Sequence, residues 1–136
     1  FQQKVNMIGL DTSAIIDIFK GDEKIKNFLE TNKEPLASTI INYLELFFGI
    51  NTENPKHIAE GKYYDEFFKG LYSIGLSSEA CKEASKIFWA LKKEGRVIEQ
   101  FDCIAAACFL TRGITKMLTR NPEHFGRIKQ LSVISY

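Results

Sequence analysis

The sequence predicts an α/β domain, specifically a three-layer α/β/α sandwich around a largely parallel sheet of four to five strands. Short apolar segments alternate with stretches of helical period, and this alternation is typical of parallel sheets whose strands are joined by helices. The 136 residues contain no repeat, low-complexity segment or linker rich in Pro, Gly and Ser. We therefore expect residues 1–136 to form one domain.

Five segments have the length and the apolar character of buried strands. They are Met7–Leu10, Pro35–Ala37, Leu71–Ile74, Thr115–Thr119 and Ser132–Ser135. Residues 1–6 precede Met7, which could be the natural start. We interpret these six residues either as an added or N-terminal extension, or as the beginning of an extended first strand.

The strongest helix pattern is Ser78–Glu94, with Ser77 placed to cap its start and Gly95 to end it. A helix is also expected over Asp102–Arg112, and another over Thr39–Gly49 with Ser38 as its N-cap. The other predicted helices are Thr12–Lys20, Glu23–Thr31, Pro55–Lys69 and a short one that begins with Asn121 as cap and Pro122 as first residue.

The composition excludes some classes of protein. A net charge of +1 gives no global basic field of the kind that marks an obvious nucleic-acid binder. Cys81, Cys103 and Cys108 form no CxxC pair, and we expect reduced, buried thiols in a cytoplasmic protein. No apolar run approaches the roughly 20 residues that span a bilayer, and no signal peptide is visible.

Three acidic residues are placed near the carboxyl ends of predicted strands, where open parallel sheets bind their ligands. Asp11 follows the first strand directly, and taken alone it is better explained as a helix N-cap. Glu45 falls just past the edge of an apolar helical arc formed by Ile40, Ile41, Leu44, Phe47 and Phe48. Asp102 stands in the first turn of a very apolar helix, where the helix dipole alone could account for it.

Another group of polar residues, Thr119 to His124, follows the fourth strand. It places Glu123 and His124 at the same edge as the three acids. Carboxylates brought close together repel one another unless cations neutralise them. Ligation by oxygen atoms suits Mg²⁺ or Mn²⁺, which favour phosphate substrates and can activate water for phosphodiester cleavage.

Four elements together resemble the PIN domain, and most closely the VapC-type toxins of toxin–antitoxin pairs. They are Leu10-Asp-Thr-Ser-Ala-Ile-Ile-Asp, Glu45 in the following helix, Asp102-Cys-Ile-Ala-Ala-Ala, and Thr119-Arg-Asn-Pro-Glu-His-Phe. The resemblance covers Met7 to Tyr136. It implies a PIN-like fold and an endoribonuclease that depends on Mg²⁺ or Mn²⁺. It also implies a homodimer inhibited by a small antitoxin, with DNA bound only through that antitoxin.

The resemblance also implies the roles of individual residues. Asp11, Glu45 and Asp102 match the catalytic and metal-binding acids. Thr119 and Asn121 match an element that supports the site by hydrogen bonds, and Thr12 and Ser13 belong to the first motif. The family often has a further acid where His124 stands, so Glu123 or His124 is the candidate fourth ligand, and one firmly bound metal is expected rather than two.

Basic residues that could steer a phosphate backbone are Lys20, Lys116, Arg120 and Arg127, with Arg120 as the candidate substrate ligand. Two alternatives within the fold are an RNA-processing nuclease without antitoxin and a catalytically weak protein-binding module. In the latter, Tyr43, Leu46, Phe67 and Phe68 would be contact residues, unless they are core. A phosphotransfer site is disfavoured because Leu71–Leu76 contains no Asp and position 13 is Ser.

Overall fold

The computed structural model describes residues 3–136 and contains, as predicted, a five-stranded parallel sheet. Its strands are β1 (Ile8–Leu10), β2 (Leu36–Thr39), β3 (Tyr72–Ile74), β4 (Lys116–Leu118) and β5 (Ser132–Ile134). Their order across the sheet is β3-β2-β1-β4-β5, and all neighbours are parallel. The first strand in the chain is therefore the central one, and β2 and β4 flank its carboxyl end.

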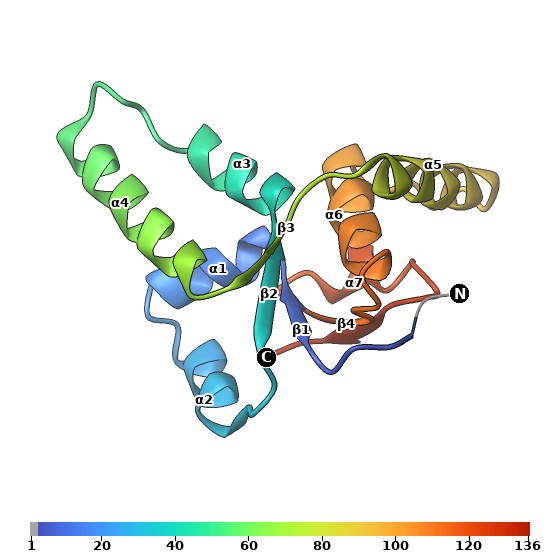
Figure 1. The fold of residues 1–136 in the computed structure, drawn as a ribbon, viewed down its shortest axis with the longest axis horizontal. Helices are drawn as coiled ribbons and strands as arrows, with labels where there is room; N and C mark the ends of the chain where they lie inside the picture. Colours follow the sequence, from blue (N-terminus) through green and yellow to red (C-terminus); the bar gives the residue numbers. More distant parts are fainter. Residues whose placement is uncertain (1–2) are drawn as a thin grey trace.

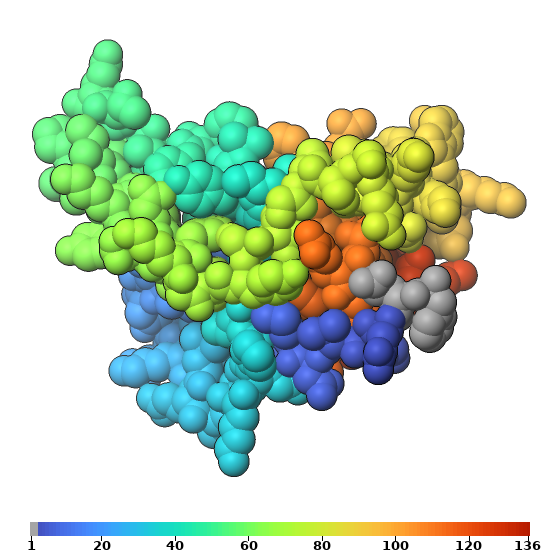
Figure 2. Space-filling model, viewed as in Figure 1, coloured from blue at the N-terminus to red at the C-terminus, as the bar shows by residue number. Residues whose placement is uncertain are grey.

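Helices cover both faces of this sheet, which confirms the three-layer sandwich (Figure 1). They are α1 (Thr12–Phe19), α2 (Glu23–Thr31), α3 (Ile40–Phe48), α4 (Pro55–Lys69), α5 (Ser78–Lys93), α6 (Gln100–Leu110) and α7 (Pro122–Phe125). Helices α1 to α4 lie on one side, and α5 to α7 on the other. The strip of chain from β3 to α5, yellow-green in Figure 2, crosses the molecule between these two groups.

Each face of the sheet has its own apolar core, because successive residues of a strand point to opposite faces. Ile8 and Leu10 of β1 pack in the core with α1, α2 and α3, whereas Gly9 between them faces Phe109 of α6. A Cβ atom at Gly9 would lie 2.7 Å from the Phe109 ring. The glycine therefore lets α6 pack directly against the central strand.

Most predicted helix ends are confirmed to within two residues. Ser77 caps α5 by accepting a hydrogen bond from the backbone N–H of Ala80, and Gly95 after that helix has φ +69°. The N-cap of α3 is a correction. It is Thr39, whose hydroxyl accepts from the backbone N–H of Asn42, because Ser38 is still part of β2 and its hydroxyl reaches the carbonyl of Leu10.

The buried face of α3 also differs from the prediction. Ile40, Leu44 and Phe48 are 46%, 39% and 69% exposed, whereas Ile41 and Phe47 of the predicted apolar arc are buried or packed against the core. The buried residues of α3 are Ile41, Leu46 and the polar Asn42. Asn42 is tolerated there because its polar atoms are hydrogen bonded. Pattern analysis places polar residues outside, and so it centred the buried face on Ile40, Leu44 and Phe48 rather than on Asn42.

Three further expectations can be compared with the structure. Strand β1 begins at Ile8, so residues 3–7 do not extend it, and residues 1–2 lie outside the described part. Cys103 and Cys108 are buried as expected, whereas Cys81 is exposed, since it lies on the outer face of α5. Within residues 3–136, no helix is long and apolar enough to cross a membrane.

The residues proposed as contacts of a binding module belong to the core. Leu46 and Phe68 are buried, and Tyr43 and Phe67 pack partly buried against them beneath α4. Aromatic rings meet there edge to face, with 5.2 Å between the centroids of Tyr43 and Phe68. The core interpretation of these four side chains is therefore correct.

Candidate active site

The carboxyl ends of β1, β2 and β4 bring polar side chains from distant parts of the chain together. Leu10 pairs with Leu118 in the sheet register, so Asp11 after β1 lies next to Thr119 after β4. On the other side of β1, β2 ends at Thr39 and leads into α3, which contains Glu45. The first turn of α6 adds Asp102. This is the sheet edge at which the sequence predicted a site.

Asp11 is buried and its carboxylate is surrounded by donors. Its oxygens accept hydrogen bonds from the Ser13 hydroxyl at 2.8 and 2.9 Å, from the backbone N–H of Ala14 at 2.9 Å and from the Thr119 hydroxyl at 2.6 Å. Burial raises the pKa of Asp11, and these hydrogen bonds together with the charge of Arg120 oppose that rise. Asp11 is thus both the N-cap of α1 and a fixed carboxylate at the site.

Glu45 is half-buried, and one neighbour holds its carboxylate. The Thr12 hydroxyl donates to its Oε1 at 2.8 Å. Burial raises the pKa of Glu45, the Thr12 hydrogen bond lowers it, and the charges of Asp11 and Glu99 raise it further. Thr12 follows Asp11 in the chain, so the first motif supports two of the acids at once.

Asp102 is the least compensated of the three acids. It is half-buried, and no hydrogen bond to its side chain is found among residues 3–136. Burial, followed by the charges of Glu45, Glu99 and Asp11, raises its pKa to about 6, against a small opposing effect of His124. The three predicted acids therefore lie close enough to repel one another.

Glu123 and His124, the two candidates for the fourth ligand, differ in their effect on the three acids. His124 is exposed at the start of the chain after β4, and its charge acts on Asp102, whereas Glu123 is not among the charges that shift the pKa of the three acids. Sequence reasoning missed Glu99, which raises the pKa of both Glu45 and Asp102. Its position three residues before Asp102, one helical turn away, was the available signal.

The predicted supporting residues form a connected network. Thr119, fully buried, donates to Asp11 and accepts from the backbone N–H of Asn121 at 2.9 Å. Ser13 donates to Asp11 and accepts from the backbone N–H of Arg120 at 3.2 Å. Asn121 is the N-cap residue of α7, as predicted, yet its side chain makes no capping hydrogen bond. These contacts fix the loop after β4 against Asp11.

Arg120 is the basic side chain nearest this network. Its Nη1 lies 3.0 Å from Oδ1 of the buried Asp17, and the Tyr136 hydroxyl donates to the other oxygen of Asp17 at 2.5 Å. Lys116, in contrast, begins β4 and pairs with Glu34 at 2.6 Å. It lies at the amino end of the sheet, away from the acids, so the expectation that it steers substrate there is wrong.

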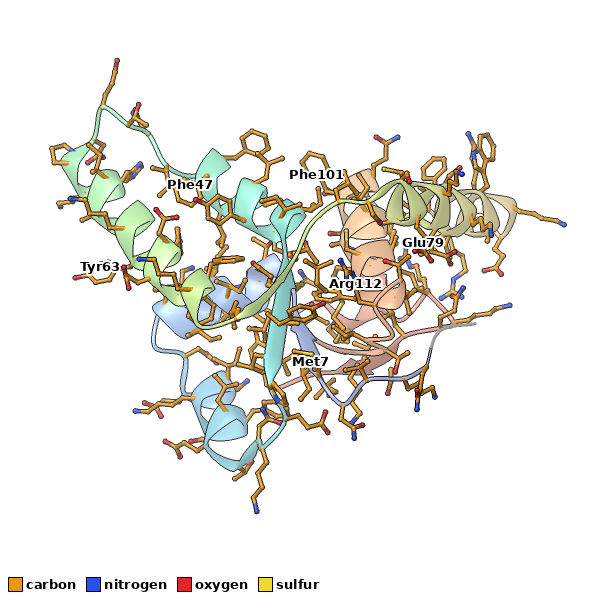
Figure 3. The ribbon with its side chains drawn as sticks, viewed as in Figure 1. Met7, Phe47, Tyr63, Glu79, Phe101 and Arg112 are labelled. Atoms are coloured by element: carbon orange, nitrogen blue, oxygen red, sulfur yellow. The ribbon has the colours of Figure 1, made fainter. Side chains whose placement is uncertain are left out.

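Two residues that the sequence pattern did not single out as part of the site, Asn42 and Phe101, lie next to the acids in the structure. Asn42, buried on α3, donates to Thr12 at 3.1 Å. Phe101 precedes Asp102 and projects from α6 toward α3 (Figure 3), where its ring stacks on Phe48 with 6.4 Å between centroids. The stacked apolar rings of Phe48 and Phe101 therefore lie beside Asp102.

The donor set suits a hard divalent cation. In residues 3–136, no three Asp, Glu, His or Cys side chains stand close enough to hold a metal ion as they are, so binding requires side-chain rotation. Asp102 has no competing hydrogen bond, and burial followed by repulsion from Glu45 and Asp11 raises its pKa. A cation bound by carboxylate oxygens removes that repulsion.

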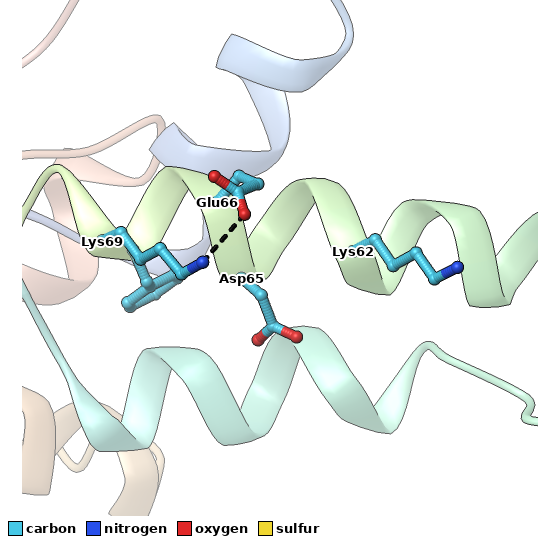
Figure 4. Close-up of a pocket in the computed structure, with 5 residues that line it drawn as sticks. Lys62, Asp65, Glu66 and Lys69 are labelled. Carbon is cyan, nitrogen blue, oxygen red and sulfur yellow. Dashed lines mark hydrogen bonds and ion pairs between the residues drawn. The ribbon is translucent and has the colours of Figure 1, made fainter.

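A separate groove lies away from the three acids. It has a volume of about 620 Å³ and is lined by Lys62, Asp65, Glu66, Phe68 and Lys69 of α4 (Figure 4). Lys69 pairs with Glu66 at 2.9 Å, and Asp65 accepts from the Tyr43 hydroxyl at 2.6 Å. Three of its four charged side chains thus have partners, and none of the three clustered acids lines it.

Comparisons with known proteins agree with this geometry. The fold matches VapBC2 from Rickettsia felis, crystallised with a DNA fragment from its promoter, with TM-score 0.82, 22% identity, and 96% of this chain and 98% of that chain covered. It matches DNA-bound VapBC from Salmonella typhimurium with TM-score 0.82, 20% identity and coverage of 96% and 98%. It matches VapBC-1 from nontypeable Haemophilus influenzae with TM-score 0.80 and 23% identity, and the match covers 95% of this chain and 97% of that chain.

These likenesses establish the fold and agree with the VapC-type resemblance. A sequence comparison with curated proteins gives no match. The PIN domain model matches residues 8–131, which include every element of the sheet edge described above. Proteins with this domain are generally nucleases. The chain belongs to the PIN domain family.

Proposed function

We propose that this chain is an endoribonuclease that depends on Mg²⁺ or Mn²⁺ and is the toxin of a toxin–antitoxin pair. The convergence of Asp11, Glu45 and Asp102 at one sheet edge carries the proposal. Structural ion pairs do not explain this convergence, because none of the ion pairs found among residues 3–136 includes these three acids, and the charges of Glu45 and Asp11 add to burial in raising the pKa of Asp102. Acids that destabilise one another in a site are commonly there for a ligand.

In this proposal Asp11, Glu45 and Asp102 supply carboxylate oxygens to the cation. A bound divalent cation lowers the pKa of water and offsets phosphate charge. Ser13 and Thr119 keep Asp11 in place, and Thr12 keeps Glu45 in place. Arg120, half-exposed beside Asp11, binds a phosphate of the RNA backbone. With His124 in the position of the fourth acid, one cation is held firmly.

The test is RNA cleavage by purified protein with Mg²⁺, Mn²⁺ or EDTA. We expect Asp11→Asn and Asp102→Asn each to reduce metal-dependent cleavage by at least 100-fold, since each removes a charged ligand. Glu53→Gln is the matched control, because Glu53 is an exposed carboxylate in the loop between α3 and α4. Cleavage that survives in both Asn variants, or in EDTA, would contradict the proposal.

An antitoxin partner is supported by the solved relatives, which are VapBC toxin–antitoxin complexes, two of them with DNA. In this proposal a small antitoxin binds the chain in the cytoplasm, inhibits it, and makes any DNA contact. Co-expression with the small reading frame next to its gene tests this. A stable complex with reduced cleavage supports it, and full cleavage in the presence of that product favours an RNA-processing nuclease without antitoxin.

A homodimer is supported by the outer face of α3. Ile40, Leu44 and Phe48 follow one another every four residues and form an exposed apolar row, which Phe101 of α6 extends. Exposed apolar rows of this kind mark contact surfaces. We expect light scattering to give the dimer mass and Phe48→Glu to give the monomer mass. A monomeric native chain would contradict this part of the proposal.

A further inference from the structure

Asn42 is a buried polar side chain whose place on α3 calls for an explanation. It is 1% exposed and lies on the buried side of α3 with Ile41 and Leu46. Its Oδ1 accepts from the Thr39 hydroxyl at 2.6 Å and from the Ser38 hydroxyl at 3.2 Å. Its Nδ2 donates to the Thr12 hydroxyl at 3.1 Å. Burial of an amide is costly unless such bonds are made, and an apolar residue would avoid that cost altogether.

The hydrogen bonds around Asn42 have a defined direction. The Thr39 hydroxyl accepts from the backbone N–H of Asn42 as the N-cap of α3, so its own proton is available to Oδ1 of the same residue. The amide NH₂ group then faces Thr12. A Thr12 hydroxyl that accepts from this group has its single proton left for Glu45, to which it donates at 2.8 Å.

Position along the chain explains how this network reaches the site. Asn42 precedes Glu45 by three residues, so both lie on one side of α3, the amide buried and the carboxylate half-buried above it. Thr12 belongs to α1 and follows Asp11. The connection from Thr39 through Asn42 and Thr12 to Glu45 therefore joins the ends of two neighbouring strands, β1 and β2.

We propose that Asn42 is a positioning residue, whose amide fixes the Thr12 hydroxyl as the donor that orients Glu45 toward Asp11 and Asp102. The proposal rests on the proposed function in so far as the oriented carboxylate serves a cation. Residues that orient metal ligands through hydrogen bonds commonly change metal affinity 10- to 100-fold when they are replaced.

The first measurement is the side-chain rotamer of Glu45 in the metal-free protein, from its three-bond NMR couplings. We expect a single χ1 rotamer in the native chain and averaging over rotamers in Asn42→Ala and in Thr12→Val. The matched control is Asn32→Ala, because Asn32 also makes side-chain hydrogen bonds, at 2.8 and 3.1 Å, but at the opposite end of β2. A Glu45 rotamer that stays fixed in Asn42→Ala overturns the proposal.

Asn42→Asp is a second variant in case Asn42→Ala does not fold. The carboxylate has the same size and still accepts from Ser38 and Thr39, but it has no proton to donate to Thr12. Rotamer averaging is expected in this variant as well. A fixed rotamer in a folded Asn42→Asp chain also overturns the proposal, since donation to Thr12 is then unnecessary.

The second measurement is Mn²⁺ affinity by calorimetry without RNA. We expect Asn42→Ala and Thr12→Val each to weaken binding about tenfold, and the double variant to bind no more weakly than Thr12→Val alone. Effects that add in the double variant overturn the proposal, because Asn42 then acts independently of Thr12. Absence of Mn²⁺ binding by the native chain counts against the proposed function, whereas the rotamer measurement still tests the positioning role.

Discussion

The hydroxyl of Thr119 donates a 2.6 Å hydrogen bond to Oδ2 of Asp11, from the end of one central strand to the end of its neighbour. The two residues are 108 positions apart in the chain. The same hydroxyl accepts from the backbone N–H of Asn121. The Thr119 side chain thus fixes both the first acid of the site and the loop that contains Arg120. We therefore expect substitutions of Thr119 to disturb both.

Thr119→Val removes both hydrogen bonds and keeps the shape of the side chain. Because Asp11 and Thr119 are buried, we expect the free energy of unfolding to fall by about 1 to 3 kcal/mol, the cost of an unsatisfied buried polar group. Thr119→Ser retains the hydroxyl and should lose less. Urea denaturation of the two variants checks this, and equal stabilities would show that the hydroxyl contributes nothing.

Asp102→Asn should stabilise the metal-free protein at neutral pH. The folded-state pKa of about 6 lies above the ordinary value of 3.8 for an Asp side chain, so folding is most favourable while Asp102 is protonated. The stability that the protonated Asp102 contributes is lost as the pH rises from about 4 through about 6. The neutral amide avoids the loss, and because Asp102 is only half-buried we expect a gain on the order of 1 kcal/mol.

The measurement is urea denaturation in EDTA at pH 7.5 and at pH 4. The gain from Asp102→Asn should be present at pH 7.5 and absent at pH 4, where the native carboxyl is also neutral. Glu53→Gln should change neither value. Destabilisation by Asp102→Asn at pH 7.5 would mean that the carboxylate has a stabilising partner that its surroundings do not reveal.

Proton competition should make cation binding dependent on pH. Asp102 binds a proton below its pKa of about 6, and burial also raises the pKa values of Asp11 and Glu45. Since only carboxylates bind the cation, affinity should be constant above about pH 7 and fall about tenfold for each unit below pH 6. Mn²⁺ calorimetry from pH 5 to pH 7.5 measures this, and a constant affinity over that range would rule out ligation by Asp102.

The sequence allowed the fold and the three acids to be predicted, because both depend on local patterns. Strands, helix caps and strand-end acids are readable from neighbouring residues. Asn42 and Asp17 were missed because each looks like an ordinary helical polar residue until its partners, Thr12 and Arg120, are known. The exposed row on α3 was assigned to the core for the same reason, since hydropathy does not distinguish a core face from a contact face.

Arg120 should contribute to RNA affinity through its charge. It is half-exposed, and the buried Asp17 holds its guanidinium at 3.0 Å near Asp11. Arg120→Gln should weaken RNA binding at all sequences and lower the slope of log affinity against log salt by about 1. Asp17→Asn leaves the positive charge of Arg120 in place and should alter RNA affinity less. The measurement is RNA binding in Ca²⁺ at several salt concentrations.

Lys116→Gln serves as the control for Arg120, because Lys116 carries the same charge at the amino end of the sheet, paired with Glu34. It should leave the salt slope unchanged. If Lys116→Gln and Arg120→Gln lowered the slope equally, RNA would be attracted by the overall charge of the chain rather than by a contact at Arg120.

Gly9→Ala should destabilise the fold from the centre of the sheet. The added Cβ would lie 2.7, 2.8 and 2.9 Å from three atoms of the Phe109 ring, and Phe109 has no exposed surface. Overpacking of this kind costs about 1 to 3 kcal/mol. Gly75→Ala is the control, because a Cβ at Gly75 meets no atom within 4 Å.

Phe109→Leu should relieve this overpacking by shortening the ring that the new methyl group meets. We therefore expect the double variant to be at least about 1 kcal/mol more stable than the sum of the two single effects. Urea denaturation of the native chain, both single variants and the double variant gives this coupling. Additive effects would show that the added methyl group does not meet the Phe109 ring, and that close packing of α6 on β1 does not explain the glycine at position 9.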